Sequence, residues 1–292
     1  MNKLRGTGIA MVTPFKGDKS VDFEALTTLT NHLIEGGVDY LVVMGTTAES
    51  PTLSKVEKIK VLDHVLQIND GRLPIVYGMG GNSTQALVDE FNHADLEGVD
   101  AILSASPYYN KPSQIGIIEH YTKIADASPR PVILYNVPGR TASNMEATTT
   151  IELANHENIV AMKEASGSLE QVMHIINEKP DEFLVISGED ALTYPMLALG
   201  GEGVISVVGN AYPKVLSEMV NAALRGEYSI AKKKHYDLLK VTDCLFKDGN
   251  PAGIKSCLNM MGICEEELRL PLVPVKKATR RELEFQMEEI AK

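Results

Sequence analysis

The stretch NIVAMKEASG, residues 158–167, begins as a continuous apolar run and reaches Lys163 at its end. A run that is apolar at every position is typical of a strand buried on both faces, and such strands belong to parallel sheets covered by helices. A buried ammonium group is costly unless it is paired or neutral. A desolvated lysine is a nucleophile towards carbonyl compounds through a Schiff base, although a strand-end lysine more often extends to solvent.

Similar short apolar runs recur at intervals of about 20 to 34 residues, the length of one strand plus one crossover helix. The expected strands begin near Gly8, Tyr40, Pro74, Asp100, Pro131, Asn158, Phe183 and Gly203. Helical periodicity predicts helices at 23–35, 55–68, 84–97, 113–125 and 169–177, with helix C-caps at Gly36-Gly37, Gly98 and Gly200-Gly201. Eight such units predict a closed (β/α)8 TIM barrel.

A doubly wound sheet shares this alternation and is the competing fold. It is favoured by a glycine fingerprint after the first strand, but that turn reads TPFK at 13–16. The GMGG segment at 78–81 lacks the last glycine of the fingerprint and is better explained by a tight strand-to-helix turn.

Beyond about Arg225 the strand pattern stops, and helical patterns follow at 228–246, 251–262 and 279–291. We expect these segments to form a helical appendix packed on the barrel. The predicted organisation is therefore a catalytic barrel over residues 1–224 and a C-terminal helical region over 225–292.

Composition excludes several classes of protein. The net charge is −11 and no basic stripe offsets it, which argues against a nucleic-acid partner. No apolar stretch approaches the length of a membrane span or a signal peptide, so no membrane association and a cytoplasmic location are expected. The three cysteines and seven histidines match no metal or redox spacing, so we infer no metal, no cofactor and no hydrolytic triad.

Active-site residues of a barrel come from the carboxyl ends of its strands and the loops that follow. Those positions here read GTTAES at 45–50, SPYYNKP at 106–112, YNVPGRT at 135–141, Lys163, and SGED at 187–190. Each group has an ordinary alternative, such as a helix cap, a space-filling aromatic ring or a solvated charge. The convergence of an amine, phenols, paired hydroxyls and a guanidinium on one face favours a site.

These segments closely resemble the dihydrodipicolinate synthase family of the N-acetylneuraminate lyase superfamily. The match includes GTTAES, SPYYNKP, YNVPGRT and MKEASG, with NPAGIKSCLNMMG and LRLPLVP in the appendix. It runs from about Gly8 to about Pro274. The resemblance implies condensation of pyruvate with L-aspartate 4-semialdehyde to 4-hydroxy-tetrahydrodipicolinate, on the route to diaminopimelate and lysine.

The resemblance also implies roles for individual residues. Lys163 would form the imine with pyruvate, and its enamine would add to the aldehyde. A relay of hydroxyl groups would carry protons, because a phenol with a pKa near 10 is a poor unaided base. That relay is assigned to Tyr135, Thr46 and Tyr109, with Tyr109 supplied by a neighbouring subunit of a homotetramer built as a dimer of dimers.

Substrate-binding roles follow from the same resemblance. Thr47 would hold the pyruvate carboxylate together with backbone N–H groups. Arg140 would bind the carboxylate of the semialdehyde through its two-pronged donor geometry. Gly188 and Ile205 would line the site near the lysine.

Regulated members of the family bind L-lysine at a dimer interface. The corresponding positions here are Ser50, Lys55, Lys58, Gly80, Asn82, Ala86 and Tyr108. Lys55 and Lys58 stand where sensitive members have histidines, and Ala86 stands where they have a glutamate. Two added cations and one lost carboxylate predict weak or absent inhibition by lysine, unless both lysines point outward from their helix.

Two rival functions remain at the level of sequence. A sister pyruvate-dependent aldolase that cleaves N-acetylneuraminate or a keto-deoxy sugar acid would share Lys163 and Tyr135. It would be expected to lack Arg140 and the Thr46-Thr47 pair. A non-catalytic regulator that binds a keto acid should have lost the lysine or gained a DNA-binding segment, and the sequence has neither feature.

Overall fold

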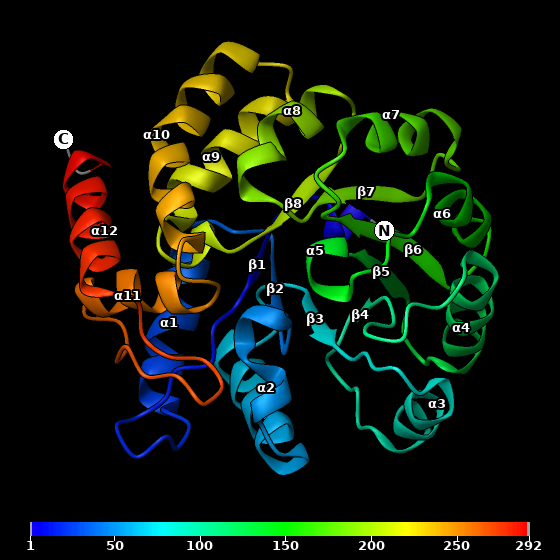
Figure 1. Ribbon diagram of the computed structural model, residues 1–292, viewed down its shortest axis with the longest axis horizontal. Coiled ribbons are helices and arrows are strands. Elements are labelled where there is room, and N and C mark those ends of the chain that lie inside the picture. The colour runs from blue at the N-terminus through cyan, green and yellow to red at the C-terminus, as the bar shows by residue number, and fades with distance from the viewer. Residues whose placement is uncertain (1, 291–292) are drawn as a thin grey trace.

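The apolar runs pair side by side in parallel order. In the computed structural model, which describes residues 2–290, eight strands close into one barrel, each hydrogen-bonded to its neighbour in sequence (Figure 1). The strands are β1 Gly6–Ala10, β2 Tyr40–Val43, β3 Ile75–Gly78, β4 Ala101–Ala105, β5 Val132–Asn136, β6 Ile159–Glu164, β7 Leu184–Ser187 and β8 Gly203–Ser206. The predicted TIM barrel is confirmed, and the doubly wound alternative is wrong.

Alternation along the strands decides which side chains enter the barrel. On β6, Ala161 packs inside the barrel and Met162 packs outward against the helices. Because side chains alternate, Lys163 points inward again, at the carboxyl end of the strand. On β5, Ile133 and Tyr135 belong to the same interior cluster. The register of two neighbouring strands therefore places a lysine and a tyrosine together at the open end.

A single large ring fills part of the interior. Tyr40 is fully buried, and its O–H donates to the backbone oxygen of Val204 at 3.3 Å. A Cβ atom on Gly8 would lie 2.1 Å from the Tyr40 ring. Glycine at this position of β1 is therefore what allows the ring to fit.

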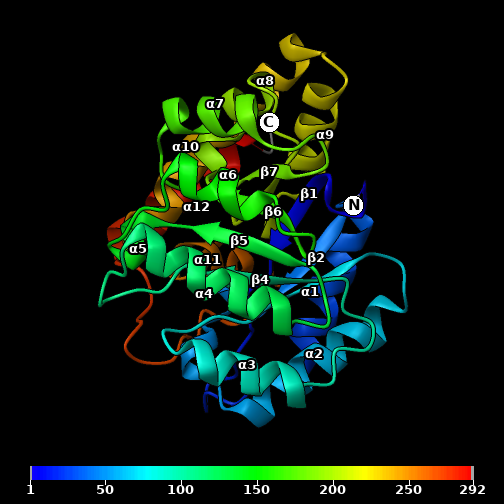
Figure 2. The same ribbon diagram turned by 90° about the vertical axis from the view of Figure 1, so that its right-hand side faces the viewer.

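Helices cover the outside of the strands, as Figures 1 and 2 show from two directions. They are α1 Phe23–Glu35, α2 Lys55–Asn69, α3 Thr84–His93, α4 Gln114–Ala127, α5 Pro138–Thr141, α6 Ala147–Ala154, α7 Leu169–Glu178, α8 Thr193–Ala198 and α9 Pro213–Leu224. Several begin at a side chain that accepts backbone N–H bonds, which fixes where the helix starts. These N-caps are Asp22, Ser54, Ser83, Ser113 and Ser168.

Three sequence expectations need correction. β1 begins at Gly6, two residues before the expected start. The third predicted helix ends at His93, not at 97, because Ala94 adopts an extended conformation and the chain turns inward to bury Leu96. Gly98 is therefore not a helix C-cap; with φ of +76°, it lies in the turn that leads into β4.

The C-terminal appendix consists of α10 Tyr228–Phe246, α11 Ala252–Met260 and α12 Lys277–Ile290. α10 packs along α9 and α12, and α11 packs against α10 and α12, on one side of the barrel (Figure 1). Residue 291 of the last predicted helix lies outside the described residues. The boundary between barrel and appendix at 224/225 stays a proposal, supported by the end of α9 at Leu224. No helix within residues 2–290 is long and apolar enough to cross a membrane.

Candidate active site

Lys163 and Tyr135 face each other across the ladder between β5 and β6. They are register partners, and the Lys163 Nζ atom lies 4.4 Å from the centre of the Tyr135 ring. Only 5% of Lys163 is exposed. Among residues 2–290, no hydrogen bond or ion pair holds its Nζ atom, so the amine is free to meet a ligand at the open end of the barrel.

Two adjoining hollows open at this end. The larger, of about 610 Å³, includes Lys163, and the smaller has a volume of about 280 Å³. Thr46, Tyr135, Val137 and Arg140 line both of them. The amine, the phenol, one threonine hydroxyl and the guanidinium predicted from the sequence therefore surround one continuous region.

Two threonines follow β2 in the short 3-10 helix η2, Thr46–Ala48. Thr47 is buried, and its Oγ1 atom accepts a hydrogen bond of 2.9 Å from the side-chain amide of Asn250. The same turn is held by Thr13, in the loop after β1, whose hydroxyl donates to the backbone oxygen of Ala48 at 2.8 Å. These bonds fix the turn beside Lys163.

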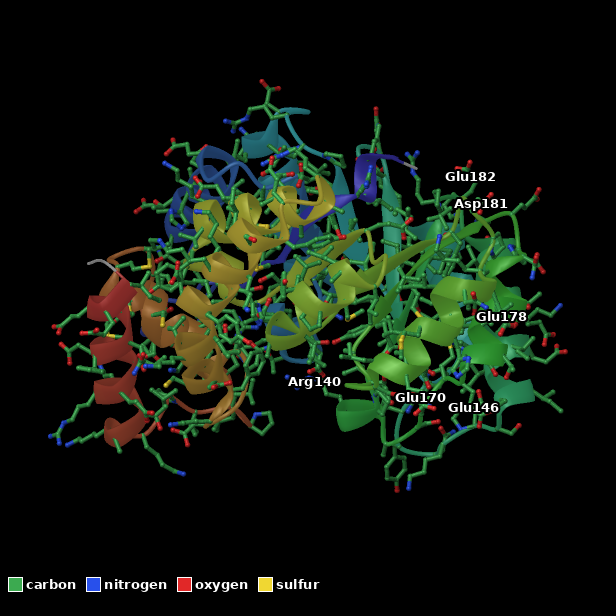
Figure 3. The ribbon with its side chains drawn as sticks, turned by 90° about the horizontal axis from the view of Figure 1, so that it is seen from above. Arg140, Glu146, Glu170, Glu178, Asp181 and Glu182 are labelled. Carbon is green, nitrogen blue, oxygen red and sulfur yellow. The ribbon has the colours of Figure 1, made fainter. Side chains whose placement is uncertain are left out.

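Arg140 lies in α5, a single turn that begins with Pro138. Its side chain is exposed, and its guanidinium makes no hydrogen bond or ion pair to any described residue. In Figure 3 it lies apart from the labelled acidic side chains, which are Glu146, Glu170, Glu178, Asp181 and Glu182. The charge is therefore available to the carboxylate of a ligand.

Gly188 gives Lys163 its space. A Cβ atom at this position would lie 2.8 Å from Ala165 Cβ and 3.1 Å from Lys163 Cε. Ile205, by contrast, is buried inside the barrel opposite Gly8, and it lines neither hollow. Gly188 therefore leaves space beside the Lys163 side chain, whereas Ile205 does not line the hollow that contains Lys163.

Tyr108 and Tyr109 are neighbours in the loop after β4, but only Tyr108 lines a hollow. Tyr108 lines the smaller hollow and exchanges two 2.9 Å hydrogen bonds with Asn82. Tyr109 has a φ of +70°, is 87% exposed and lines neither hollow. A single chain therefore does not bring Tyr109 to Lys163.

Six of the seven positions that correspond to the lysine-binding site of regulated family members line two hollows in a single chain; the seventh, Asn82, lines neither and bonds to Tyr108. Ser50, Gly80 and Tyr108 line the smaller of the two active-site hollows. A separate hollow of about 530 Å³, between α2 and α3, is lined by Lys55, Lys58 and Ala86 together with Asp63, Asp89 and Glu90.

Sequence reasoning assigned no role to two buried polar residues in the larger hollow, Asp190 and Asn250. Asp190 accepts backbone N–H bonds from Val207 and Val208 at 3.0 and 2.9 Å. Burial raises the pKa of its carboxyl group, and these bonds and the charge of Lys163 oppose that rise. Its place directly after β7 was a usable signal, whereas Asn250 lies in the appendix, far from any strand end.

Within the described part of the chain, no group of three histidine, cysteine, aspartate or glutamate side chains is arranged to hold a metal ion. The three cysteines are buried and unpaired, and burial raises the pKa of each thiol. Raised thiol pKa values keep the reactive thiolate form scarce.

A (β/α)8 barrel with an unpaired amine, a phenol and hydroxyls at the carboxyl ends of its strands is typical of enzymes that form a Schiff base with a carbonyl substrate. Comparison with known proteins defines the group more closely. Residues 3–290 match the model of the dihydrodipicolinate synthetase family, and the chain belongs to this family.

Several relatives about half identical to the chain carry the same name. A 4-hydroxy-tetrahydrodipicolinate synthase of Parabacteroides distasonis is 52% identical over 277 residues, which cover 94% of this chain and 93% of the relative. The chloride-inhibited dihydrodipicolinate synthase of Acinetobacter baumannii, solved with pyruvate, is 35% identical with a TM-score of 0.96, covering 99% of each chain. The enzyme of Cyanidioschyzon merolae, solved with lysine bound, is 37% identical with a TM-score of 0.95, again covering 99% of each chain.

Proposed function

We infer that this protein is a lyase that condenses pyruvate with L-aspartate 4-semialdehyde to give 4-hydroxy-tetrahydrodipicolinate. The observation that carries this conclusion is the buried Lys163 amine, facing Tyr135 at the open end of a barrel that matches this family along residues 3–290. Relatives about half identical to the chain carry the name of this activity, which favours it over cleavage of a sugar acid and over a non-catalytic regulator.

The chemistry balances with the groups present. The Lys163 amine adds to the ketone carbon of pyruvate and water leaves, which gives an imine. Loss of a methyl proton gives an enamine, whose carbon forms the new bond to the aldehyde carbon of the semialdehyde. Attack of the semialdehyde's own amino group on the imine carbon then closes the ring and releases the lysine amine.

We propose that the protons of these steps pass along Tyr135, Thr46 and Tyr109. Tyr135 and Thr46 support this role because both line the two adjoining hollows beside Lys163. A chain of hydroxyls avoids the need for a free phenolate, which a pKa near 10 makes scarce at neutral pH. Because Tyr109 is exposed and lines neither hollow of its own chain, the proposal requires a second copy to supply it.

We also propose which groups bind each substrate. Thr47, buried at the turn after β2, would donate to the pyruvate carboxylate, and Arg140 would clamp the carboxylate of the semialdehyde. Gly188 would leave the space that Lys163 needs, and Ile205 would support the wall from inside the barrel.

The proposed assembly is a homotetramer built as a dimer of dimers, active in the cytoplasm. The exposed Tyr108 and Tyr109 on the loop after β4 support a self-complementary two-fold contact near the active site. The amine of Lys163 supplies the electron sink that the reaction needs, so the proposal includes no cofactor and no metal.

The decisive test traps the imine. Borohydride added with pyruvate should reduce the Schiff base and leave a stable adduct, which peptide mapping should place on Lys163. Lys163→Arg keeps the charge but cannot deprotonate to form the imine, so it should lose nearly all activity, as should Lys163→Ala. The matched control is Lys179→Ala, outside the site, which should keep full activity. Label on another lysine would overturn the assignment.

A further inference from the structure

The appendix lines the larger hollow with residues of α10 and with Asn250, and Asn250 bonds to Thr47. Asn250 lies between α10 and α11, 203 residues from Thr47 along the chain, and its Nδ2 atom donates to Thr47 Oγ1 at 2.9 Å. Both residues are buried, and both line the larger hollow with Lys163. The hydrogen bond between Asn250 and Thr47 therefore joins two residues that line the site itself.

This bond decides which way the Thr47 hydroxyl donates. A hydroxyl group carries one donor and two acceptor positions. The Asn250 amide occupies an acceptor position, and no other described side chain or carbonyl group bonds to Thr47 Oγ1. The hydroxyl hydrogen is consequently left to point into the hollow. If the group at the position of the amide accepted a hydrogen bond from Thr47 instead, the hydroxyl hydrogen would point away from the hollow.

The opposite end of the Asn250 amide is also unusual. Its Oδ1 atom is buried and has no hydrogen-bond partner among residues 2–290. Buried polar atoms are rarely left unpaired, and the exceptions often mark places where water or a ligand binds. The Asn250 amide thus donates to Thr47 from its nitrogen, while its buried oxygen has no partner among the described residues.

We propose that Asn250 is a positioning residue for pyruvate: its amide holds the Thr47 hydroxyl so that the O–H donates to the pyruvate carboxylate. This inference rests on the proposed role of Thr47. The alternative is that Asn250 merely fastens the appendix to the turn after β2, a task that the buried Lys255–Glu49 ion pair also performs.

The test measures pyruvate binding apart from the second substrate. The readout is the pyruvate concentration that gives half-maximal borohydride-trapped adduct, measured by mass spectrometry. Asn250→Asp keeps the shape but can only accept at this position, so the half-saturating concentration should rise by about tenfold or more. Asn250→Ala, which adds no charge, should raise it by about threefold to tenfold.

Two controls separate positioning from other effects. Asn259→Asp changes another appendix asparagine, which bonds to Cys264 and Arg280 and not to the turn, and it should leave the half-saturating concentration unchanged. In a Thr47→Val background, both Asn250 variants should have little further effect, because residues that act through one contact are not additive.

The outcomes are distinct. Full effects of the Asn250 variants in the Thr47→Val background, no effect in the native background, or an equal effect of Asn259→Asp would each overturn the positioning role. If the unaltered protein gives no adduct at all, it is the proposed function that fails. A large rise that disappears with Thr47→Val supports the inference.

Discussion

At the scale of single residues, Arg140 is the group proposed to distinguish the two substrates. Its guanidinium has no protein partner among the described residues and borders both hollows. Arg140→Ala should therefore raise the KM for the semialdehyde by about tenfold to a hundredfold, while the KM for pyruvate changes little. Steady-state kinetics with each substrate varied in turn measure this difference.

A matched variant tests whether the loss of any exposed arginine charge is enough to raise the KM for the semialdehyde. Arg225→Ala removes an exposed arginine that pairs with Glu227 on the protein surface, and it should leave both KM values unchanged. If Arg140→Ala raises both KM values equally, Arg140 supports the loop or the fold instead of binding the semialdehyde.

The site residues differ in how far sequence alone could place them. Lys163 and Tyr135 end apolar strands, and the alternation of side chains fixes the side on which they lie. Asn250 ends no strand. Its position depends on how the appendix packs against the turn after β2, which no local pattern in the sequence encodes.

At the scale of elements, the appendix and the turn after β2 are joined by a buried ion pair. Lys255 of α11 bonds to Glu49 at 2.6 Å, both side chains are fully buried, and the Lys255 ammonium lies 4.1 Å from the centre of the Phe15 ring. Burial lowers the pKa of Lys255, and the charge of Glu49 opposes that shift. Glu49 itself occupies the left-handed region, with a φ of +56°.

Removal of one partner should be costly, because the other charge is left buried and unpaired. Lys255→Met should lower the free energy of unfolding by about 3–5 kcal/mol, measured by denaturant titration. The control is Lys247→Met, which breaks a 2.5 Å pair with Glu282 that is nearly half exposed and should change stability by about 0–1 kcal/mol. Equal losses of unfolding free energy from the two variants would show that burial does not determine how much an ion pair contributes to stability.

Element boundaries show where sequence prediction stops working. The strand positions followed from short apolar runs, and α1 and α10 begin and end at the predicted residues. The end of α3 did not follow from its sequence pattern, because the burial of Leu96 outweighed the helical pattern that continued to residue 97. Tertiary packing decided that boundary, which helix propensity alone does not determine.

At the scale of the whole molecule, the proposed role of Tyr109 would make assembly a condition of activity. The residue is 87% exposed in a single chain, so its proposed place in the relay requires a second copy. Lys163→Ala and Tyr109→Phe subunits should each be nearly inactive alone. If they are mixed, dissociated and reassembled, hybrids should regain part of the activity, since one of the shared sites then has both native residues.

A mixture measured before subunit exchange is the control, and it should remain inactive. Size-exclusion chromatography with light scattering establishes that hybrids of the expected mass have formed. Hybrids that recover no activity would mean that Tyr109 acts within its own chain or has no catalytic role.

The proposed contact between subunits also bears on regulation by lysine. The hollow that contains Ser50, Gly80 and Tyr108 has no carboxylate among its described lining residues, and Arg140 adds a cation to it. The neighbouring hollow contains Lys55 and Lys58, and four carboxylates, those of Asp63, Asp89, Glu90 and Asp95, line it beside them. An amino acid with two ammonium groups would therefore meet Arg140 without a carboxylate in the first hollow, and Lys55 and Lys58 beside the carboxylates in the second.

Like charges brought together in a partly dry site repel, so L-lysine should inhibit this enzyme weakly or not at all up to the millimolar range. An activity titration with L-lysine at saturating pyruvate measures this. Combining Lys55→His and Lys58→His with Ala86→Glu should create inhibition, because the variant removes two fixed cations and adds one anion. Lys60→His, on the same helix but outside the hollow, should not. Sub-millimolar inhibition of the unaltered enzyme would contradict the electrostatic argument, and it would mean that the four carboxylates already present compensate for the missing glutamate.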